Sequence, residues 1–266
     1  MSAEFLYQLP TWLTSLVYIS VLLAALEFGY FVGQRLQDSW KNANPTNGQI
    51  ILTSMFAVFG LMLAFTYGAG VDRFDTSKKA VVLEANAIST AFLRADLAAE
   101  PERTELKQAL LDYAHTRSMD QGRRHSRERF KEHIQKSLQV QSKLWPITEQ
   151  IVEQNHLDPI VTSRLVDAID QVINVHTIRI AARFDELPIA VILMLLLVSA
   201  ASLSVAGFNA GISGRLNRLR MTTFAFVLTG VMLVILDFDQ PLDGFIHISL
   251  DSLTNLVNEM EANLAQ

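Results

Sequence analysis

The chain has no cysteine among its 266 residues. Disulfide bonds, zinc–thiolate sites and thiol catalysis are therefore excluded. Charged residues are scarce, at 18% of the chain, whereas soluble domains carry about 25%. The net charge of −5 argues against a general nucleic-acid-binding protein. Sequence motifs of common enzymes are missing too, including phosphate-binding loops, HExxH, dinucleotide-binding glycines and the nucleophile elbow. We expect no catalytic residues, no enzymatic activity and no organic cofactor.

The shortage of charge is local. Four long apolar segments contain almost no charge, while the region between the second and third is densely charged. A charged side chain at the bilayer centre costs about 2.5–3.5 kcal/mol, and about 20 apolar residues cross the hydrocarbon core. The sequence therefore predicts an integral protein of the cell membrane with four spanning helices, at 11–33, 49–70, 187–208 and 221–236. The first segment has no basic residue before it and no cleavage site after it, so we interpret it as a retained helix.

The rest of the chain shows helical periodicity and no strand-like alternation, so the expected fold is all-α. We expect two transmembrane hairpins at 1–70 and 187–237, a helical extramembrane domain at 71–186, and an acidic tail at 238–266. No Pro or Gly interrupts 71–99, which predicts that the second spanning helix continues out of the bilayer as one rod. That stretch carries a packing seam at spacings of 3 and 4, formed by Val81, Ala85, Ile88, Phe92 and Ala95.

Boundary signals divide the extramembrane domain into further helices. Pro101 begins one, and a helix over 123–145 is expected to end or kink at Pro146. Asp158 followed by Pro159 is typical of an N-cap and restarts the chain. In the tail, 249–264 has the pattern of an amphipathic helix.

Glu27 is the only carboxylate inside a predicted spanning segment. An ionisable residue there suggests a proton site, a cation site or a partner for an arginine. The structural alternative is that Glu27, about 10 Å from the helix end, reaches the headgroups or bonds a neighbouring helix. Both interpretations stay open.

Small residues recur every four positions in the first two spans, at Gly29 and Gly33 and at Gly60, Ala64 and Gly68. Such faces let helix backbones approach each other in lipid. They predict helix packing, and they also permit tight packing between subunits.

The tripeptide Arg-Phe-Asp occurs twice, beside the second and third spans. The simpler interpretation is interfacial anchoring by arginine and phenylalanine. In a symmetric oligomer the same residues would form charged rings at a pore mouth. The residues concerned are Arg73, Asp75, Arg183 and Asp185.

Three acids follow the last span, at Asp237, Asp239 and Asp243. Carboxylates suit a hard cation such as calcium, but the spacing is not that of a calcium-binding helix–loop–helix, because its twelfth position is Ile248. A solvated acidic end is the favoured interpretation, and a weak calcium site is the alternative.

The stretch from Phe59 to Phe74 resembles the second helix of bestrophins, with Phe65 eight residues before Arg73. Nearly the whole chain is similar to the bacterial bestrophin-like domain family. The shared pieces are Glu27-Phe-Gly, Arg73-Phe-Asp, Glu84-Ala-Asn86-Ala-Ile88, and Asp237-Phe-Asp-Gln-Pro241 with Gly244.

This resemblance implies a homopentameric ion channel that passes small anions or monovalent ions. The implied apolar pore neck falls on Ala57, Leu61 and Phe65, of which only Phe65 keeps the bulky aromatic side chain. The implied calcium clasp after the fourth helix is sparser here. Two alternatives remain: a non-conducting sensor or scaffold whose helical domain binds a partner, and a proton-coupled transporter using Glu27.

The orientation in the membrane is nearly balanced by charge. Positive-inside counting over the hairpin loops places the helical domain outside the cell, whereas the resemblance places it in the cytoplasm, which we favour. Five basic residues lie on each side: Arg35, Lys41, Arg215, Arg218 and Arg220 against Arg73, Lys78, Lys79, Arg179 and Arg183.

Overall fold

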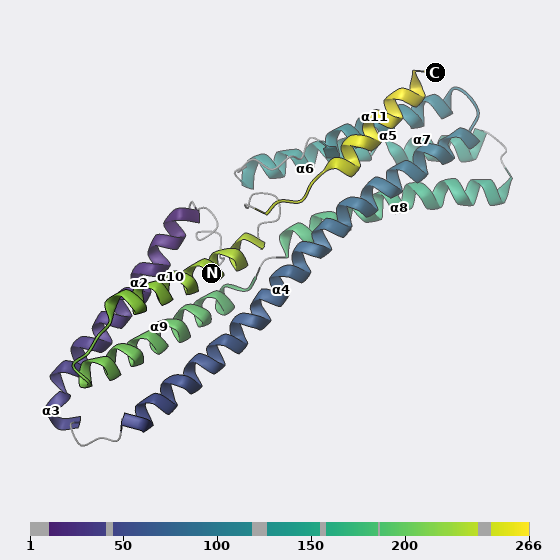
Figure 1. Ribbon diagram of the computed structural model, residues 1–266. Coiled ribbons are helices and arrows are strands. Elements are labelled where there is room, and N and C mark those ends of the chain that lie inside the picture. The colour runs from purple at the N-terminus through teal and green to yellow at the C-terminus, as the bar shows by residue number, and fades with distance from the viewer. Residues whose placement is uncertain are drawn as a thin grey trace. The chain divides into compact units, whose positions relative to one another are not determined.

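The computed structural model describes residues 11–40, 45–118, 127–154, 158–185, 187–238 and 246–265. Throughout these ranges the regular secondary structure is helical, which confirms the all-α prediction (Figure 1). The chain divides into two compact units. The membrane unit comprises Met1–Asp72 and Glu186–Asp239, and the extramembrane unit comprises Arg73–Asp185 and Gln240–Gln266.

Four helices of the described residues are long and apolar enough to cross a membrane. The membrane unit contains α2 (Thr11–Arg35), the short α3 (Gln37–Trp40), the first part of α4 (Pro45–Arg94), α9 (Ile189–Ile212) and α10 (Arg218–Phe238). The four predicted spans are therefore confirmed as helices. The last is longer than expected, because the helix begins at Arg218 and not at Met221, so its first turn is charged.

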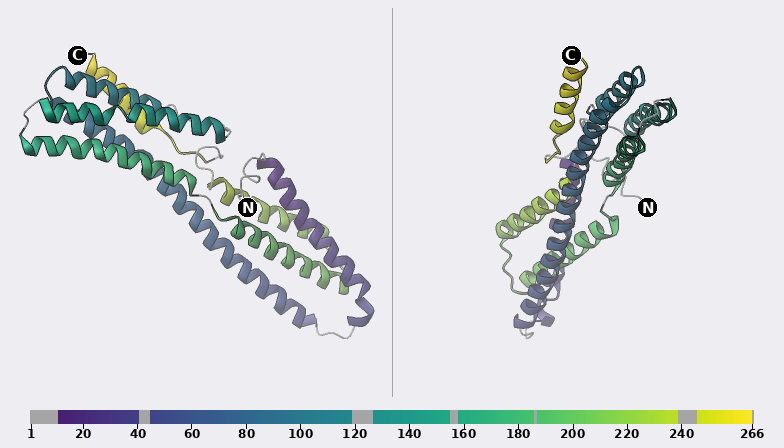
Figure 2. Two further views of the ribbon diagram at one scale, coloured as in Figure 1. Left: turned by 180° about the vertical axis from the view of Figure 1, so that it is seen from behind. Right: turned by 90° about the vertical axis from the view of Figure 1, so that its right-hand side faces the viewer.

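Helices α2 and α9 lie side by side along their length (Figures 1 and 2). Leu22 and Leu26 of α2 and Leu195 and Leu203 of α9 are buried in the core of this unit. The hydroxyls of Tyr18 and Ser199 also lie 3.0 Å apart between the two helices. The pair α2–α9 is the scaffold of the membrane unit.

The extramembrane unit is a bundle around the second part of α4. It contains η1 (Ala95–Leu97), α5 (Glu102–Ser118), α6 (Arg127–Gln141), α7 (Leu144–Gln154), α8 (Pro159–Phe184) and α11 (Asp251–Leu264). As expected, α4 is continuous from Pro45 to Arg94. Its predicted seam is buried in the core, formed by Val81, Ala85, Ile88, Phe92 and Ala95.

Two boundaries in this unit refine the expectations. The helix predicted over 123–145 ends at Gln141, and Pro146 lies in the first turn of α7, where a missing N–H leaves no helix hydrogen bond unmade. The expected N-cap is present, because the Asp158 side chain accepts a 2.8 Å hydrogen bond from the Ile160 N–H.

The predicted acidic tail contains α11. This helix packs against α5 (Figure 2). Its apolar face is buried in the same core as the α4 seam, through Leu253, Leu256, Val257 and Met260. Polar contacts join the two helices as well. Lys107 Nζ donates to Asn263 Oδ1 at 3.0 Å, and His115 Nε2 lies 2.9 Å from Glu261 Oε1.

Candidate functional site

The first part of α4 has one face that packs on its own chain and an opposite face that does not. Phe59 and Thr66, seven residues apart and therefore on one side of the helix, are buried. Leu61 and Phe65 are 58% and 70% exposed, and Ala57 is exposed as well. Residues 57 and 59 differ by about 200° around a helix. The predicted neck residues thus form a stripe turned away from the rest of the chain.

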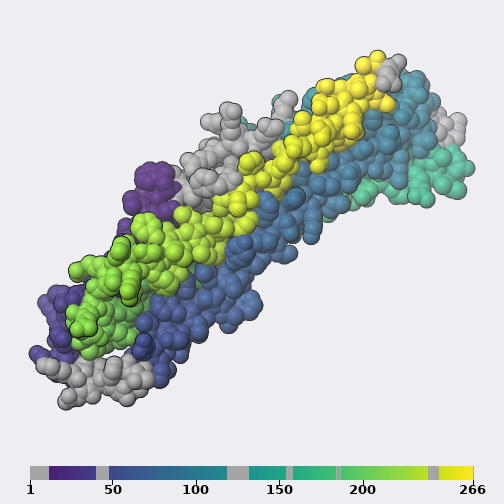
Figure 3. All heavy atoms as spheres, in the orientation of Figure 1, coloured from purple at the N-terminus to yellow at the C-terminus, as the bar shows by residue number. Residues whose placement is uncertain are grey.

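This uncovered face extends along the whole membrane part of α4, whose atoms lie open at the surface in Figure 3. Other large apolar side chains on it are also more than half exposed, namely Ile50, Ile51 and Val58. Within a single chain, α4 is therefore the least covered of the spanning helices.

The predicted packing glycines fall into two groups. Gly29 and Gly33 of α2 lie directly on the α9 backbone, because a Cβ on Gly29 would be 2.7 Å from the Ser204 carbonyl carbon. The contact is reciprocal: a Cβ on Gly207 would be 2.9 Å from the Tyr30 nitrogen. For Gly60 and Gly68 of α4, by contrast, no described atom would lie within 4 Å of an added Cβ, and Ala64 is exposed.

Glu27 forms an ion pair with Arg218 at the start of α10. Arg218 Nε donates to Oε1 at 2.8 Å and Nη2 to Oε2 at 3.4 Å, a bidentate geometry. The guanidinium also lies 5.7 Å from the Tyr30 ring centre. Both side chains remain about half exposed or more within the chain. Of the interpretations that the sequence left open, this geometry matches two, the arginine partner and the bond to a neighbouring helix, because Arg218 begins α10.

The two Arg-Phe-Asp tripeptides meet in the extramembrane unit. Arg73 Nε of the first copy donates to Asp185 Oδ2 of the second at 3.2 Å. Asp185 is exposed and Arg73 is largely covered. Asp75 is exposed and Arg183 is half-buried. One predicted pair of mouth charges is thus brought together, while Asp75 stays open to solvent.

Comparison with known proteins identifies the family. Residues 16–253 match the family described as Bestrophin-like domain. The chain belongs to this family. Its fold is similar to that of a bacterial bestrophin homologue from Klebsiella pneumoniae whose structure was phased with zinc, with a TM-score of 0.66 and 11% sequence identity, covering 93% of this chain and 98% of that one. A tryptophan-to-alanine variant of a Klebsiella pneumoniae homologue gives a TM-score of 0.68 at 13% identity, covering 95% and 99%. A comparison with curated proteins found no match.

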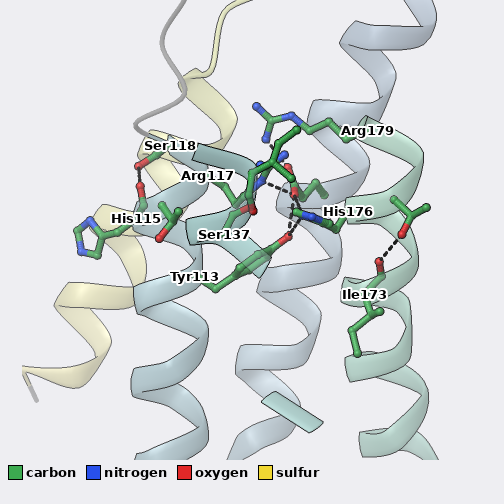
Figure 4. Close-up of polar contacts among 12 residues, drawn as sticks. Tyr113, His115, Arg117, Ser118, Ser137, Ile173, His176 and Arg179 are labelled. Atoms are coloured by element: carbon green, nitrogen blue, oxygen red, sulfur yellow. Dashed lines mark hydrogen bonds and ion pairs between the residues drawn. The ribbon is translucent and has the colours of Figure 1, made fainter. Parts of the chain in front are cut away.

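The extramembrane unit of this bestrophin-like chain also contains a buried charge cluster that the sequence analysis did not predict. Glu84 of α4, Tyr113 and Arg117 of α5, and His176 and Arg179 of α8 are all buried and converge on one carboxylate (Figure 4). Arg117 Nε donates to Glu84 Oε1 at 2.8 Å, and Arg179 Nη1 donates to Oε2. Three helices are therefore joined by one acidic side chain.

Tyr113 links the carboxylate to the histidine. Its hydroxyl donates to Glu84 Oε1 at 2.9 Å and lies 2.9 Å from His176 Nδ1. Because a phenol has a single proton to donate, the second bond must be donated by the imidazole, which assigns the Nδ1–H tautomer to His176. Its Nε2 is buried and has no hydrogen-bond partner among the described residues.

The cluster shifts two pKa values in opposite directions. Burial would raise the pKa of Glu84, but the nearby His176 imidazole, Arg179 and Arg117 outweigh it and hold that pKa well below its usual range. Burial, and next the Glu84 charge, raise the pKa of Tyr113 well above its ordinary value. At neutral pH the cluster thus holds an ionised carboxylate between two guanidiniums and a protonated phenol.

The sequence did contain a signal for this cluster. Tyr113 and Arg117 continue the apolar face of α5, and His176 continues that of α8. Glu84 lies between seam residues of α4. Polar residues of complementary charge on three buried faces indicate a shared ion cluster, because an unpaired buried charge is costly.

The possible metal ligands of this bestrophin-like chain are only partly described. Asp237 is buried at the end of α10, whereas Asp239 and Asp243 lie outside the described residues. Within the described ranges, no group of three or more His, Asp or Glu side chains is placed to hold a metal ion. The calcium site therefore stays a prediction.

Proposed function

We propose that this protein is one subunit of an oligomeric ion channel whose axial pore is lined by α4. The observation that carries the proposal is the uncovered stripe of Ala57, Leu61 and Phe65, on the side of α4 opposite its own-chain contacts. A pore-lining helix needs such a face, because in one subunit its pore side touches nothing. Membership of the bestrophin-like domain family and the bestrophin fold support the same conclusion.

In this channel the stripe forms an apolar neck. Ions passing it must shed part of their hydration shell, and a narrow apolar constriction can close by dewetting. Phe65 is the largest side chain of the stripe and narrows the pore most. Ala57 is small and leaves the pore broader at its end of the neck. Small anions or monovalent ions are the proposed permeant species. A monovalent ion sheds part of its hydration shell at a much lower cost than a divalent ion, and a small ion fits a narrow neck.

The proposed assembly is a homopentamer in the lipid bilayer. Gly60, Ala64 and Gly68 lie on the uncovered part of α4, where a neighbouring subunit can approach its backbone closely. Charged rings at one mouth are formed by Asp75 and Arg183 together with the Arg73–Asp185 pair. Glu27, paired with Arg218, serves in this proposal as a structural ion pair and not as a proton carrier.

We place the extramembrane unit in the cytoplasm. The absence of cysteine makes this directly testable, because a single introduced cysteine is the only thiol. Gln108→Cys in α5 and Ser213→Cys between α9 and α10 are both at exposed positions. A membrane-impermeant maleimide added to intact cells should label Ser213→Cys and spare Gln108→Cys, and the reverse pattern contradicts the placement.

Conductance of purified protein in planar bilayers tests the channel itself. Phe65→Ala should increase conductance, because it removes the largest side chain of the neck. Phe226→Ala is the matched control, since Phe226 of α10 is 62% exposed but lies off the proposed pore. Equal currents in Phe65→Ala, Phe226→Ala and wild type would show that this stripe does not form the neck.

Two further observations separate the alternatives. Particle symmetry seen by electron microscopy should be fivefold, whereas a twofold dimer without a central opening contradicts the pore. Silence of wild type and Phe65→Ala, from protein shown to be folded, favours a scaffold whose helical domain binds a partner. A pH-driven flux that Glu27→Gln abolishes favours the proton-coupled transporter.

A further inference from the structure

One end of the membrane unit concentrates arginines. Arg35 ends α2, Arg215 follows α9, and Arg218 and Arg220 lie in the first turn of α10. Within the described stretches 11–40 and 209–220, four arginines stand against two carboxylates, Glu27 and Asp38. The set of Arg35, Arg215, Arg218 and Arg220 is here called the arginine end.

Backbone contacts bring these residues to the same end of the helices. A Cβ on Gly33 would lie 3.1 Å from the Gly211 Cα, so the last turns of α2 and α9 touch. The chain then turns at Gly214, whose φ of +64° is a left-handed conformation that suits glycine. The Arg215 N–H closes this turn on the Ala210 carbonyl at 3.2 Å. The Glu27–Arg218 pair fixes the start of α10 against α2.

Three of the four arginines have no carboxylate partner in the described part of the chain. Arg218 is neutralised by Glu27, whereas Arg35, Arg215 and Arg220 are exposed. Arg35 stacks on the Phe31 ring, 4.2 Å from its centre, which orients the guanidinium without neutralising it. Most other described arginines, by contrast, bind a carboxylate or a carbonyl, as Arg73, Arg94 and Arg117 do.

Helix stability does not explain these charges. The N-terminus of a helix carries a partial positive charge, so cations in the first turn are unfavourable there. Arg218 and Arg220 occupy that turn of α10, while the acid Asp237 lies at its opposite end, again against the dipole. The charge distribution therefore points to a partner outside the chain that is negatively charged.

The surroundings of the arginines match the headgroup layer of a bilayer. Leu219, between Arg218 and Arg220, is 78% exposed, and Phe31 beside Arg35 is 50% exposed. Apolar side chains that alternate with arginines at the ends of spanning helices suit the boundary between acyl chains and headgroups. Guanidinium groups also bind phosphate oxygens in a bidentate way that lysine does not reproduce.

We propose that the arginine end binds the phosphates of anionic lipid headgroups, with Arg35, Arg215 and Arg220 as the contacting residues around the Glu27–Arg218 pair. The lipid then supplies the anions that the chain lacks at this end of the membrane unit. Neither conduction nor subunit number enters this inference, so it stands or falls separately from the proposed channel.

Native mass spectrometry of the full-length protein in mixed micelles tests it, with phosphatidylglycerol and phosphatidylcholine of equal chain length supplied together. Wild type should retain phosphatidylglycerol about tenfold or more over phosphatidylcholine, because each basic residue adds to the attraction. The triple variant Arg35→Gln, Arg215→Gln, Arg220→Gln should lose this preference. A lysine version of the same triple variant should keep part of it, because the charge remains.

The matched control removes the same charge elsewhere. Lys136, Lys143 and Arg164 are exposed in the extramembrane unit, and Lys136→Gln, Lys143→Gln, Arg164→Gln should retain phosphatidylglycerol as wild type does. Equal retention by wild type and the arginine triple variant, at unchanged helical content, overturns the proposal. So does a wild type without preference, or displacement of the lipid by millimolar inorganic phosphate, which would indicate a site for the free anion.

Discussion

The membrane unit and the extramembrane unit are both helical, but different interactions hold their helices together. In the membrane unit, α2 and α9 approach until glycines meet backbone, as at Gly29 and Gly207. In the extramembrane unit, the helices share a core of buried apolar side chains and are joined by buried charges around Glu84. Lipid offers no hydrophobic drive between helices, so close backbone packing replaces it. In water, apolar burial drives association and the charges fix which helix faces meet.

The largest expected effect is on the buried cluster. Glu84→Gln leaves Arg117 and Arg179 buried without a carboxylate, and breaking a buried ion pair from one side costs about 3–5 kcal/mol. We expect the extramembrane unit to unfold at a much lower temperature, measured by circular dichroism in detergent. Glu105→Gln, at an exposed position of α5, is the control and should leave the melting temperature unchanged. Equal melting of the two variants would mean that the cluster contributes little.

A smaller effect is expected from filling the α2–α9 contact. Gly29→Ala places a methyl group against the Ser204 backbone, and overpacking of this kind costs about 1–3 kcal/mol. The membrane unit should unfold at lower denaturant concentration, followed by tryptophan fluorescence.

Gly60→Ala provides the matched comparison for that variant, since no described atom lies within 4 Å of a Cβ there. Its subunit should be as stable as wild type. If Gly60 packs on a neighbouring subunit, as proposed, the oligomer should dissociate more readily in size-exclusion chromatography. An unaltered oligomer would place the subunit contact elsewhere on α4.

Acid should weaken the extramembrane unit through the same carboxylate. The folded-state pKa of Glu84 is depressed, so its stabilisation is present above the unfolded-state pKa and is lost as the pH falls towards the folded one. The difference in unfolding free energy between wild type and Glu84→Gln should shrink by about 1.4 kcal/mol for each pH unit below about 4. Urea titrations between pH 6 and pH 3 measure it. A difference that is independent of pH would show that the carboxylate is not ionised in the folded protein.

The smallest effect is expected from the exposed ion pair of the same unit. Asp185→Asn removes the partner of Arg73, but Asp185 is 64% exposed, and such pairs contribute about 0–1 kcal/mol. The melting temperature should shift by less than for Glu84→Gln or Gly29→Ala, and the shift should vanish at high salt. A decrease in melting temperature as large as that of Glu84→Gln would show that the exposed ion pair stabilises the unit as much as the buried one does.

The sequence predicts the spans and the α4 rod well, because both depend on large, local energies. Charge in a bilayer is costly, and with no Pro or Gly over 71–99, α4 runs unbroken out of the membrane unit to Arg94. The partners of a buried residue are a different matter. The spacing alone places Glu84 next to the α4 seam. It does not predict that Arg117 and Arg179 bind Glu84, because those contacts depend on how three helices pack.

The glycines also show that the sequence does not identify packing partners. Gly29 and Gly60 belong to similar four-residue patterns in the sequence, yet one packs on α9 and the other has no described neighbour. The spacing of small residues predicts that another helix can pack closely on this face. It does not identify which helix does so. The break between Gln141 and Leu144, by contrast, has a local cause. Pro146 has no N–H to bond to the carbonyl four residues earlier, so the sequence indicated a break and placed it only a few residues too late.

The uninterrupted α4 also determines where this protein can bend. A helix of 50 residues is about 75 Å long, and its glycines are confined to its first part, at Gly48, Gly60, Gly68 and Gly70. The part after Gly70 is glycine-free and clamped by the Glu84 cluster. We therefore expect flexure in the first part of α4, next to Leu61 and Phe65. In the proposed channel, bending there would change the width of the neck, while the part after Gly70 would stay straight.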